Sequence, residues 1–248
     1  MSKVSLVVPM AGRGSRFASD GIGCPKPLLG LWGKPFFWWA TESARRAFDI
    51  GTMSFVVRRE HVENFAIDQR VLEFYPTAEI VVLDEVTNGA AETAHRAIEI
   101  MDHDGPILVN DSDHAFAVPD GSSLVRLMTD GVAGVLLSFQ SSNPAYSYVK
   151  RDQSGRVTGT VEKQVVSDCA IAGAYLFADR RTFLDAYAGY LGKCCYNEVY
   201  VSGLFDRLLD VGKIVAHQPL EAHISFGTPS ELAQLEASAA GPFWQSWQ

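Results

Sequence analysis

The sequence has few cysteines and no long apolar run. Its 248 residues include four cysteines, none of them in a C-x-x-C pair. The adjacent Cys194 and Cys195 suit neither an ordinary disulfide nor a zinc knuckle, so we expect reduced thiols. No apolar run approaches the roughly 18 residues of a membrane span, and the N-terminus lacks a long apolar stretch with a cleavage site. These absences predict a cytoplasmic protein without a membrane partner.

Positive charge is also scarce. The chain has 21 lysines and arginines against 29 aspartates and glutamates, a formal net charge of −8. An acidic protein of this kind offers no general nucleic-acid surface, although a local cluster of cations can still meet a small anion. With 47% hydrophobic residues and no repeat, low-complexity tract or linker, we expect one domain over residues 1–248.

Apolar patterns in the first half alternate between strand-like and helix-like. Strands are predicted over residues 4–9, 53–57, 80–83 and 107–109, and helices over residues 35–48, 61–74 and 90–101. Such an order favours a largely parallel sheet with helices on both faces. After residue 131 the pattern changes to strands, predicted over residues 132–139, 146–150, 157–162 and 170–177, with a hairpin turn over residues 152–155.

Small residues and cations gather directly after the first predicted strand, in the segment PMAGRGSRFASDGIGCPKPL. Its notable members are Ala11, Gly12, Gly14, Arg16 and Lys26. Small residues let backbone N–H groups turn toward an anion, and fixed positive charges offset the charge of a phosphoryl group under attack. The segment therefore predicts a loop that holds a nucleoside triphosphate.

Two commoner glycine loops do not fit. A dinucleotide fingerprint needs a third glycine, but Phe17 follows, and the strand ending near Arg58 supplies no acidic residue for a ribose. A Walker loop needs glycine, lysine and then a hydroxyl residue, whereas Gly33 and Lys34 run into Pro35.

The run GRGSRF, followed by a spacer and PKPL, resembles the signature of the nucleotidyltransferases that make NDP-sugars and CDP-activated small molecules. The resemblance implies a Rossmann-like, GT-A-like three-layer α/β/α fold with a mainly parallel mixed sheet. It implies that the loop, including Ser15, wraps an NTP and that Arg16 and Lys26 contact its phosphates. The implied reaction transfers NMP to a phosphorylated small molecule, such as a sugar 1-phosphate, and releases pyrophosphate.

Carboxylates follow the strand predicted over residues 107–109. Strand C-termini in an open α/β sheet face the ligand crevice, so Asp111 and Asp113 would face the phosphate loop. Mg²⁺ is usually bound by one or two carboxylates with phosphates and water, so we predict a Mg²⁺ site here. By resemblance, Asp113 is the metal aspartate. A turn or helix N-cap would use the same residues, and His114 fits packing against the loop better than metal binding.

Further candidates rest mainly on the resemblance. Gly89 and Ala90, in TNGAAET, allow the close approach that serves base and ribose in similar proteins, or they only start a helix. Glu162 and Lys163 resemble the pair that closes the acceptor site. Lys163 would meet the acceptor phosphate and Glu162 its hydroxyls or an amine; an exposed surface ion pair is the alternative.

Other acceptor candidates are Asp168, Gly173 and Glu198, although Glu198 would equally suit the first turn of a helix. We accordingly expect a nucleotide-binding half over residues 1–131 and an acceptor-binding half over residues 132–248.

The segment HISFGTPSEL predicts a helix start with a capping box made by Thr228, Pro229 and Glu231. Similar sugar nucleotidyltransferases commonly have a second metal aspartate two residues before the glycine of this G-T-P, where this chain has Ser225. Either Asp111 or Asp168 compensates, or phosphates and water complete the metal shell, or the acceptor differs.

Two other functions stay open at this point. Ser225 suits a non-catalytic nucleotide-binding regulatory paralogue, but the intact Arg16, Lys26 and Asp113 argue against it. A metal-dependent glycosyltransferase would use the D-S-D run for an NDP-sugar, but it needs no triphosphate loop. The sequence does not identify the base or the acceptor, nor does it decide between a monomer and a homodimer.

Overall fold

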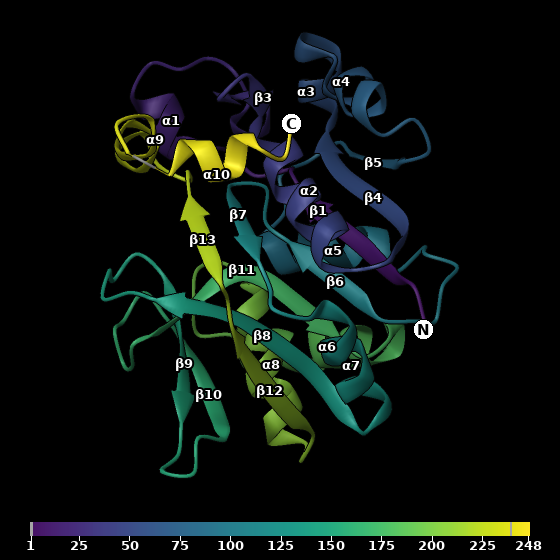
Figure 1. Ribbon diagram of the computed structural model, residues 1–248. Coiled ribbons are helices and arrows are strands. Elements are labelled where there is room, and N and C mark those ends of the chain that lie inside the picture. Colours follow the sequence, from purple (N-terminus) through teal and green to yellow (C-terminus); the bar gives the residue numbers. More distant parts are fainter. Residues whose placement is uncertain (1, 239) are drawn as a thin grey trace.

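The computed structural model describes residues 2–238 and 240–248 (Figure 1). Its strands are β1 (Val4–Pro9), β2 (Gly30–Leu31), β3 (Lys34–Pro35), β4 (Ile50–Arg58), β5 (Glu79–Leu83), β6 (Ile107–Asn110), β7 (His114–Ala117), β8 (Val132–Gln140), β9 (Ser147–Arg151), β10 (Val157–Glu162), β11 (Cys169–Phe177), β12 (Ile214–Pro219) and β13 (Ala222–Ser225). Its helices are α1 (Ser15–Ser19), the 3-10 helix η1 (Lys26–Leu28), α2 (Phe36–Ala47), α3 (Arg59–Phe65), α4 (Ile67–Phe74), α5 (Ala90–Ile98), α6 (Gly121–Thr129), α7 (Arg180–Leu191), α8 (Val201–Asp210), α9 (Pro229–Glu236) and α10 (Gly241–Gln245). No helix in these ranges is both long and apolar enough to cross a membrane.

A mixed sheet of nine strands forms the centre of the described chain. Its order begins β5-β4-β1-β6, and these neighbours run parallel. Strand β11 lies antiparallel to β6 and connects the sheet to β9 and β10 on one edge and to β8 and β12 on the other. The predicted strands are confirmed, as is the hairpin turn, in which the Gly155 N–H donates to the Asp152 carbonyl at 3.0 Å.

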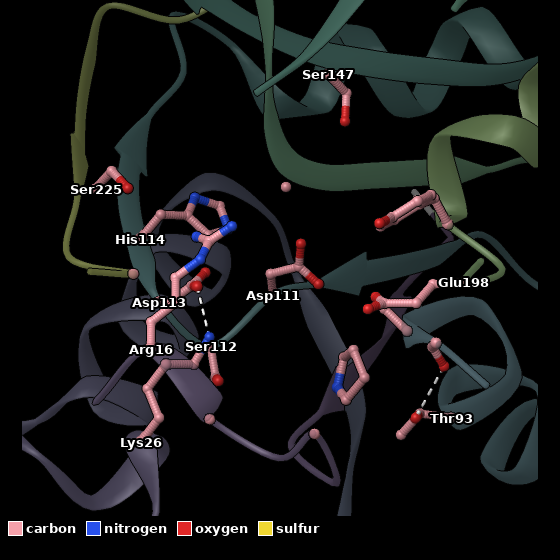
Figure 2. A pocket seen from close by; sticks show the side chains of 18 of the residues that line it. Arg16, Lys26, Thr93, Asp111, Ser112, Asp113, His114, Ser147, Glu198 and Ser225 are labelled. Atoms are coloured by element: carbon pink, nitrogen blue, oxygen red, sulfur yellow. Dashed lines mark hydrogen bonds and ion pairs between the residues drawn. The ribbon is translucent and has the colours of Figure 1, made fainter. Parts of the chain in front are cut away.

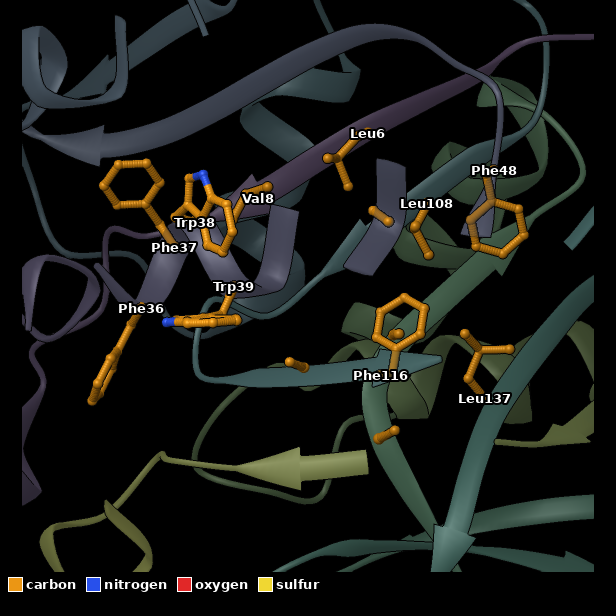
Figure 3. Packing of buried hydrophobic residues seen from close by; sticks show 14 of the residues in the cluster. Leu6, Val8, Phe36, Phe37, Trp38, Trp39, Phe48, Leu108, Phe116 and Leu137 are labelled. Carbon is orange, nitrogen blue, oxygen red and sulfur yellow. The ribbon is translucent and has the colours of Figure 1, made fainter. Parts of the chain in front are cut away.

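Strand β1 has buried side chains on both of its faces. Leu6 and Val8 belong to one hydrophobic cluster, together with side chains of α2 and α6 (Figure 3). Val7 belongs to a second cluster, together with side chains of α5, α7 and α8. A parallel strand covered on both faces reads as a continuous apolar run, and this explains the sequence of β1. The predicted three-layer α/β/α architecture is therefore confirmed.

Helix α2 supports the turn between β6 and β7. Its first four residues, from Phe36 to Trp39, are buried aromatic side chains. On its other turns, the Ala40 carbonyl accepts a hydrogen bond from Asn110 Nδ2 at 2.9 Å, and Ser43 Oγ accepts one from the Phe116 N–H at 2.9 Å. These bonds fix both ends of the segment that carries Asp111 and Asp113.

The single helix predicted over residues 61–74 is wrong. The chain forms two helices, α3 and α4, with Ala66 between them in the left-handed region at φ 50°. The break turns Ile67 and Val71 into the core. Neither glycine nor proline marks this position, and core packing overrides the local helical pattern.

The end of the chain returns to its beginning. Strand β13 pairs with β7, and α9 and α10 follow it along the chain (Figure 1). Arg46 donates to the Trp247 carbonyl at 2.9 Å, and Gln248 Nε2 donates to the Trp32 carbonyl at 2.5 Å. The C-terminal residues therefore pack on the first half of the chain.

Candidate active site

A cavity of about 640 Å³ opens at the end of the sheet where β1, β6 and β10 end. It is lined from both halves of the chain. The predicted site residues among its lining are Gly12, Gly14, Ser15, Arg16, Lys26, Gly89, Ala90, Asp111, Asp113, Glu162, Lys163, Gly173 and Glu198. Ala11 is buried beneath the loop, and Asp168 lies elsewhere.

The loop after β1 is held by a glycine turn and an aromatic anchor. Gly14 lies in the left-handed region at φ 59°, where a Cβ would come 3.4 Å from Lys26 Cβ. Phe17 is buried and packs edge-to-face against Phe36, with ring centroids 5.9 Å apart. Gly12 has no neighbouring atom within 4 Å of a Cβ position. The loop is therefore anchored at Phe17, and there is open space beside Gly12.

Lys26 and Asp113 form an ion pair across the cavity floor, with Nζ 2.6 Å from Oδ2 (Figure 2). Burial alone would raise the pKa of the Asp113 carboxyl, but the charge and the hydrogen bond of Lys26 lower it below its ordinary value. A Cβ at Gly227 would lie 2.6 Å from the same Oδ2 atom. Asp113 is thus enclosed between a cation and a close backbone.

Asp111 is fixed against a bulge in β11. Its N–H donates to the Gly173 carbonyl at 2.8 Å, where the register of β11 with β8 shifts. Gly173 has φ 70°, and a Cβ there would lie 2.9 Å from Asp111 Oδ2, so only glycine suits this position. Burial and the nearby charge of Asp113 raise the pKa of Asp111 to about 7, against the lowering effect of Lys26.

His114 is a packing residue in this geometry. It is buried, and its ring stacks on Phe116 with centroids 5.7 Å apart and lies 5.6 Å from the ring of His223. Burial lowers its pKa to about 4, so the ring is neutral at physiological pH. These contacts agree with the interpretation that His114 packs against the loop.

Glu162 is buried at the end of β10 rather than exposed. Its carboxylate accepts hydrogen bonds from Ser147 Oγ at 2.6 Å and from the Ser202 hydroxyl. Burial raises its pKa, and the two serines oppose the shift. Lys163, with φ 54°, turns to donate to the Tyr200 hydroxyl at 2.8 Å. The two side chains therefore do not form the surface ion pair considered above.

Glu198 lies in a segment that joins the two sides of the cavity. The Val199 N–H donates to the Asn88 carbonyl at 2.7 Å, and the Ala91 N–H donates to the Val199 carbonyl at 3.1 Å. A Cβ at Gly89 would lie 2.6 Å from the Val199 carbonyl oxygen. The atoms that come close to Gly89 are thus those of the Val199 backbone. Glu198 precedes α8, so it is not in the first turn of that helix.

Three solved structures are similar over nearly their whole length. A nucleoside-diphosphate-sugar pyrophosphorylase from Vibrio cholerae RC9 has 26% identity and a TM-score of 0.81, with 94% of this chain and 100% of that chain covered. An inositol-1-phosphate CTP transferase from T. maritima has 14% identity and a TM-score of 0.74, with 99% and 95% covered. A protein assigned as a glucose-1-phosphate thymidylyltransferase from Bacillus anthracis, in complex with a sucrose, has 17% identity and a TM-score of 0.76, with 95% and 94% covered. This is the nucleotidyltransferase fold.

The resemblance predicted from GRGSRF and PKPL is thereby confirmed. No protein-family model matches the chain, and no curated protein matches its sequence. Within the nucleotidyltransferase fold, the loop after β1 and the β6–β7 turn face each other as the sequence predicts.

Tyr146 and Glu231 line the cavity together with Ser225, and no sequence motif gives either of them a site role. Glu231 accepts hydrogen bonds from the Tyr146 hydroxyl and from Thr228 Oγ1, the latter at 3.1 Å. Thr228 caps α9 as predicted, accepting from the Glu231 N–H at 3.2 Å. In a capping box the Glu231 carboxylate would accept from the Thr228 N–H. Here it accepts from the Thr228 hydroxyl and from the Tyr146 hydroxyl. The only sequence signal for Glu231 was its helix-start position.

Asp168 is a predicted site residue that does not line the cavity. Its carboxylate pairs with Arg151 at 3.0 Å, and its side chain is 66% exposed outside the cavity lining. This placement gives no support to the idea that Asp168 compensates for Ser225.

The carboxylates on the β6–β7 turn fit a metal that arrives with phosphates. Among the residues the structure describes, no three His, Cys, Asp or Glu side chains gather closely enough to form a metal site by themselves. Asp111 and Asp113 nevertheless lie two residues apart on one turn, and burial, with the charge of Asp113, raises the pKa of Asp111. Two hard oxygen donors with unbalanced charge are what Mg²⁺ uses when phosphates complete its shell.

Proposed function

We propose that this protein is a nucleotidyltransferase that activates a phosphorylated small molecule. An acceptor phosphate oxygen forms a bond to the α-phosphorus of an NTP, and the bond from that phosphorus to the β-phosphate oxygen breaks. The products are an NDP- or CDP-linked molecule and pyrophosphate. The observation that carries this proposal is the single cavity shared by the cationic loop, the β6–β7 carboxylates and the Glu162–Lys163 strand end.

The nucleotide side of the cavity binds the triphosphate by charge and by backbone. Gly12, Gly14 and Ser15 would present the loop to the phosphates, and Gly89 and Ala90 would lie beside the base and ribose. Arg16 offsets the charge that develops on the leaving pyrophosphate, while Lys26 balances the α-phosphate. Since positioning and charge neutralisation account for the rate, no protein nucleophile is required.

Asp113, with Asp111, would hold the metal. Related nucleotidyltransferases generally use a divalent metal. A bound Mg²⁺ would supply charge neutralisation for the phosphates during transfer. Asp113 would hold the ion beside the loop, since its carboxylate contacts Lys26 at the start of η1, and Asp111 would hold it from the same turn.

The acceptor would lie against the ends of β10 and β11. Lys163 would contact the acceptor phosphate, and Glu162, held by Ser147 and Ser202, would accept hydrogen bonds from its hydroxyls or amine. Glu198 offers a further carboxylate. This assignment makes residues 132–248 the acceptor-binding half. Neither alternative function gains support from the similar structures.

Pyrophosphate release tests the proposal directly. Each of the four NTPs would be incubated with Mg²⁺ and a panel of sugar 1-phosphates and other phosphometabolites. One pairing should release pyrophosphate, and Arg16→Ala should lower its turnover about a hundredfold or more. Asp113→Asn should remove the magnesium-dependent rate, whereas Lys34→Met should not change it, because Lys34 packs over Trp38 and Phe74. Activity that survives Arg16→Ala or a chelator would contradict the mechanism.

A further inference from the structure

The contact between Lys26 and Asp113 places a protein cation on the carboxylate assigned to the metal. Nζ lies 2.6 Å from Oδ2, and both side chains are only 26% exposed. An Mg²⁺ ion that coordinated Oδ2 at the 2.0–2.1 Å typical of magnesium would lie within about 5 Å of this ammonium. The two cations therefore repel each other strongly if both use Oδ2, and each weakens the binding of the other.

The backbones that carry the pair are held in place, so only the side chains can exchange partners. The Phe226 N–H donates to the Asp113 carbonyl at 2.9 Å, and a Cβ at Gly227 would lie 2.6 Å from Oδ2. Lys26 starts η1, where its carbonyl accepts from the Leu29 N–H at 3.1 Å and its Cβ lies against Gly14. A lysine has four flexible side-chain bonds, and the loop beside it is the phosphate-binding segment. The natural second partner for its ammonium is thus a phosphate.

We propose that Lys26 is an internal counter-ion of the metal carboxylate, and that triphosphate binding exchanges it for the divalent cation. This inference rests on the proposed function. The lysine leaves Asp113 for the phosphates, and Asp113 becomes available to the metal that accompanies them. Metal and triphosphate binding are then coupled positively, and the protein discriminates against divalent cations that arrive without a nucleotide.

A purely structural ion pair makes the opposite prediction. If the pair only stabilises the fold, removing either partner should weaken stability and every binding step. If the exchange occurs, removing the Lys26 ammonium frees Asp113 and tightens metal binding. Removing the Asp113 charge frees Lys26 and tightens pyrophosphate binding. A gain of affinity is therefore the readout that separates the two roles.

The first test measures binding of Mn²⁺ alone, by electron paramagnetic resonance, to protein without nucleotide. Lys26→Met should bind Mn²⁺ about tenfold more tightly than the wild type, or better, because a competing cation is removed from Asp113. The matched control is Lys163→Met, which removes an equal charge from the same cavity but from a lysine bonded to Tyr200. It should change the affinity by less than about threefold, since its ammonium is not on the carboxylate. Equal effects of the two variants would overturn the proposal, as would no gain in Lys26→Met.

The reciprocal test measures pyrophosphate binding by calorimetry in chelator. Asp113→Asn frees Lys26 and should tighten metal-free pyrophosphate binding by about tenfold. At about pH 8.5, above the pKa of about 7 of Asp111, Asp111→Asn removes the same charge from the same turn without freeing Lys26, so its gain should be clearly smaller. A loss of affinity in Asp113→Asn, or equal gains in both variants, would overturn the exchange. This arm does not depend on the folding of Lys26→Met.

Both arms measure binding alone and so are separable from the proposed reaction. The expected gains without any pyrophosphate release from the NTP panel would reject the proposed activity and keep the counter-ion role. Normal turnover without the gains would reject the counter-ion role and keep the activity.

Discussion

Glu162 shows how a single buried carboxylate, which we assign to the acceptor, is held in one orientation. Its side chain sits at the end of β10 with the residue only 9% exposed, and hydroxyls from β9 and α8 meet its carboxylate. A carboxylate fixed in this way cannot turn to solvent, so it presents one orientation to a substrate. Ser147 and Ser202 position the Glu162 carboxylate, so we expect them to affect substrate binding only through Glu162.

His61 gives a prediction about pH at the residue scale. It is 7% exposed in α3, and burial, together with the charge of Arg58, lowers its pKa below the ordinary value of 6.5. The unfolded chain therefore takes up a proton more readily than the folded one. This stabilising contribution is present above pH 6.5 and is lost as the pH falls through the lowered pKa.

The test compares the wild type with His61→Asn in urea unfolding at about pH 7.5 and about pH 5. Acidification should reduce the free energy of unfolding more in the wild type than in the variant, because only the wild type carries the titrating ring. The same loss in both proteins would show that His61 does not contribute.

Local sequence predicted some site residues and missed others. The glycines and cations before Phe17, and the aspartates after β6, were found because each group is contiguous in sequence and follows a strand. Tyr146 and Glu231 were missed because they meet through a hydrogen bond between residues 85 apart. No local pattern records such a pair, since it depends on how β13 and α9 return to the cavity.

At the scale of elements, the junction between β5 and α5 depends on one glycine. Gly89 has φ 128°, and a Cβ there would meet the Val199 backbone at 2.6 Å. Gly89→Ala should therefore destabilise the fold by about 2–3 kcal/mol and displace the segment that carries Glu198.

The matched control is Gly155→Ala in the β9–β10 turn. Gly155 also has a positive φ, 84°, but no atom lies within 4 Å of its Cβ position. Its cost should be the backbone strain alone, about 1 kcal/mol. Urea unfolding of both variants checks the difference, and equal costs would show that the contact with Val199 is unimportant.

Elements with a single strong pattern were predicted, and those decided by packing were not. The apolar runs of β1, β6 and β11 identify buried strands wherever they occur. The break at Ala66 and the pairing of β13 with β7 came only from the structure. In both places the chain bends to satisfy contacts with segments far away in sequence, which residue periodicity does not encode.

At the scale of the whole molecule, nucleotide and acceptor recognition should be separable. Lys163, which we assign to the acceptor, follows β10 and donates to the Tyr200 hydroxyl at 2.8 Å. Lys163→Ala should raise the KM for the acceptor about tenfold or more, because a charged hydrogen bond to its phosphate is lost. NTP binding by calorimetry should stay near the wild-type value. A loss of NTP affinity as large as that in Arg16→Ala would place Lys163 in the nucleotide site.

The late position of β13 has a consequence for biosynthesis. The ribosome makes the loop, Asp111 and Asp113 well before Phe226, whose N–H donates to the Asp113 carbonyl at 2.9 Å. Until then a nascent chain lacks one wall of its cavity, and its long-range pairings cannot form. Products that terminate before Phe226 should accordingly lack the bond that fixes Asp113, and we expect them to release no pyrophosphate from NTP.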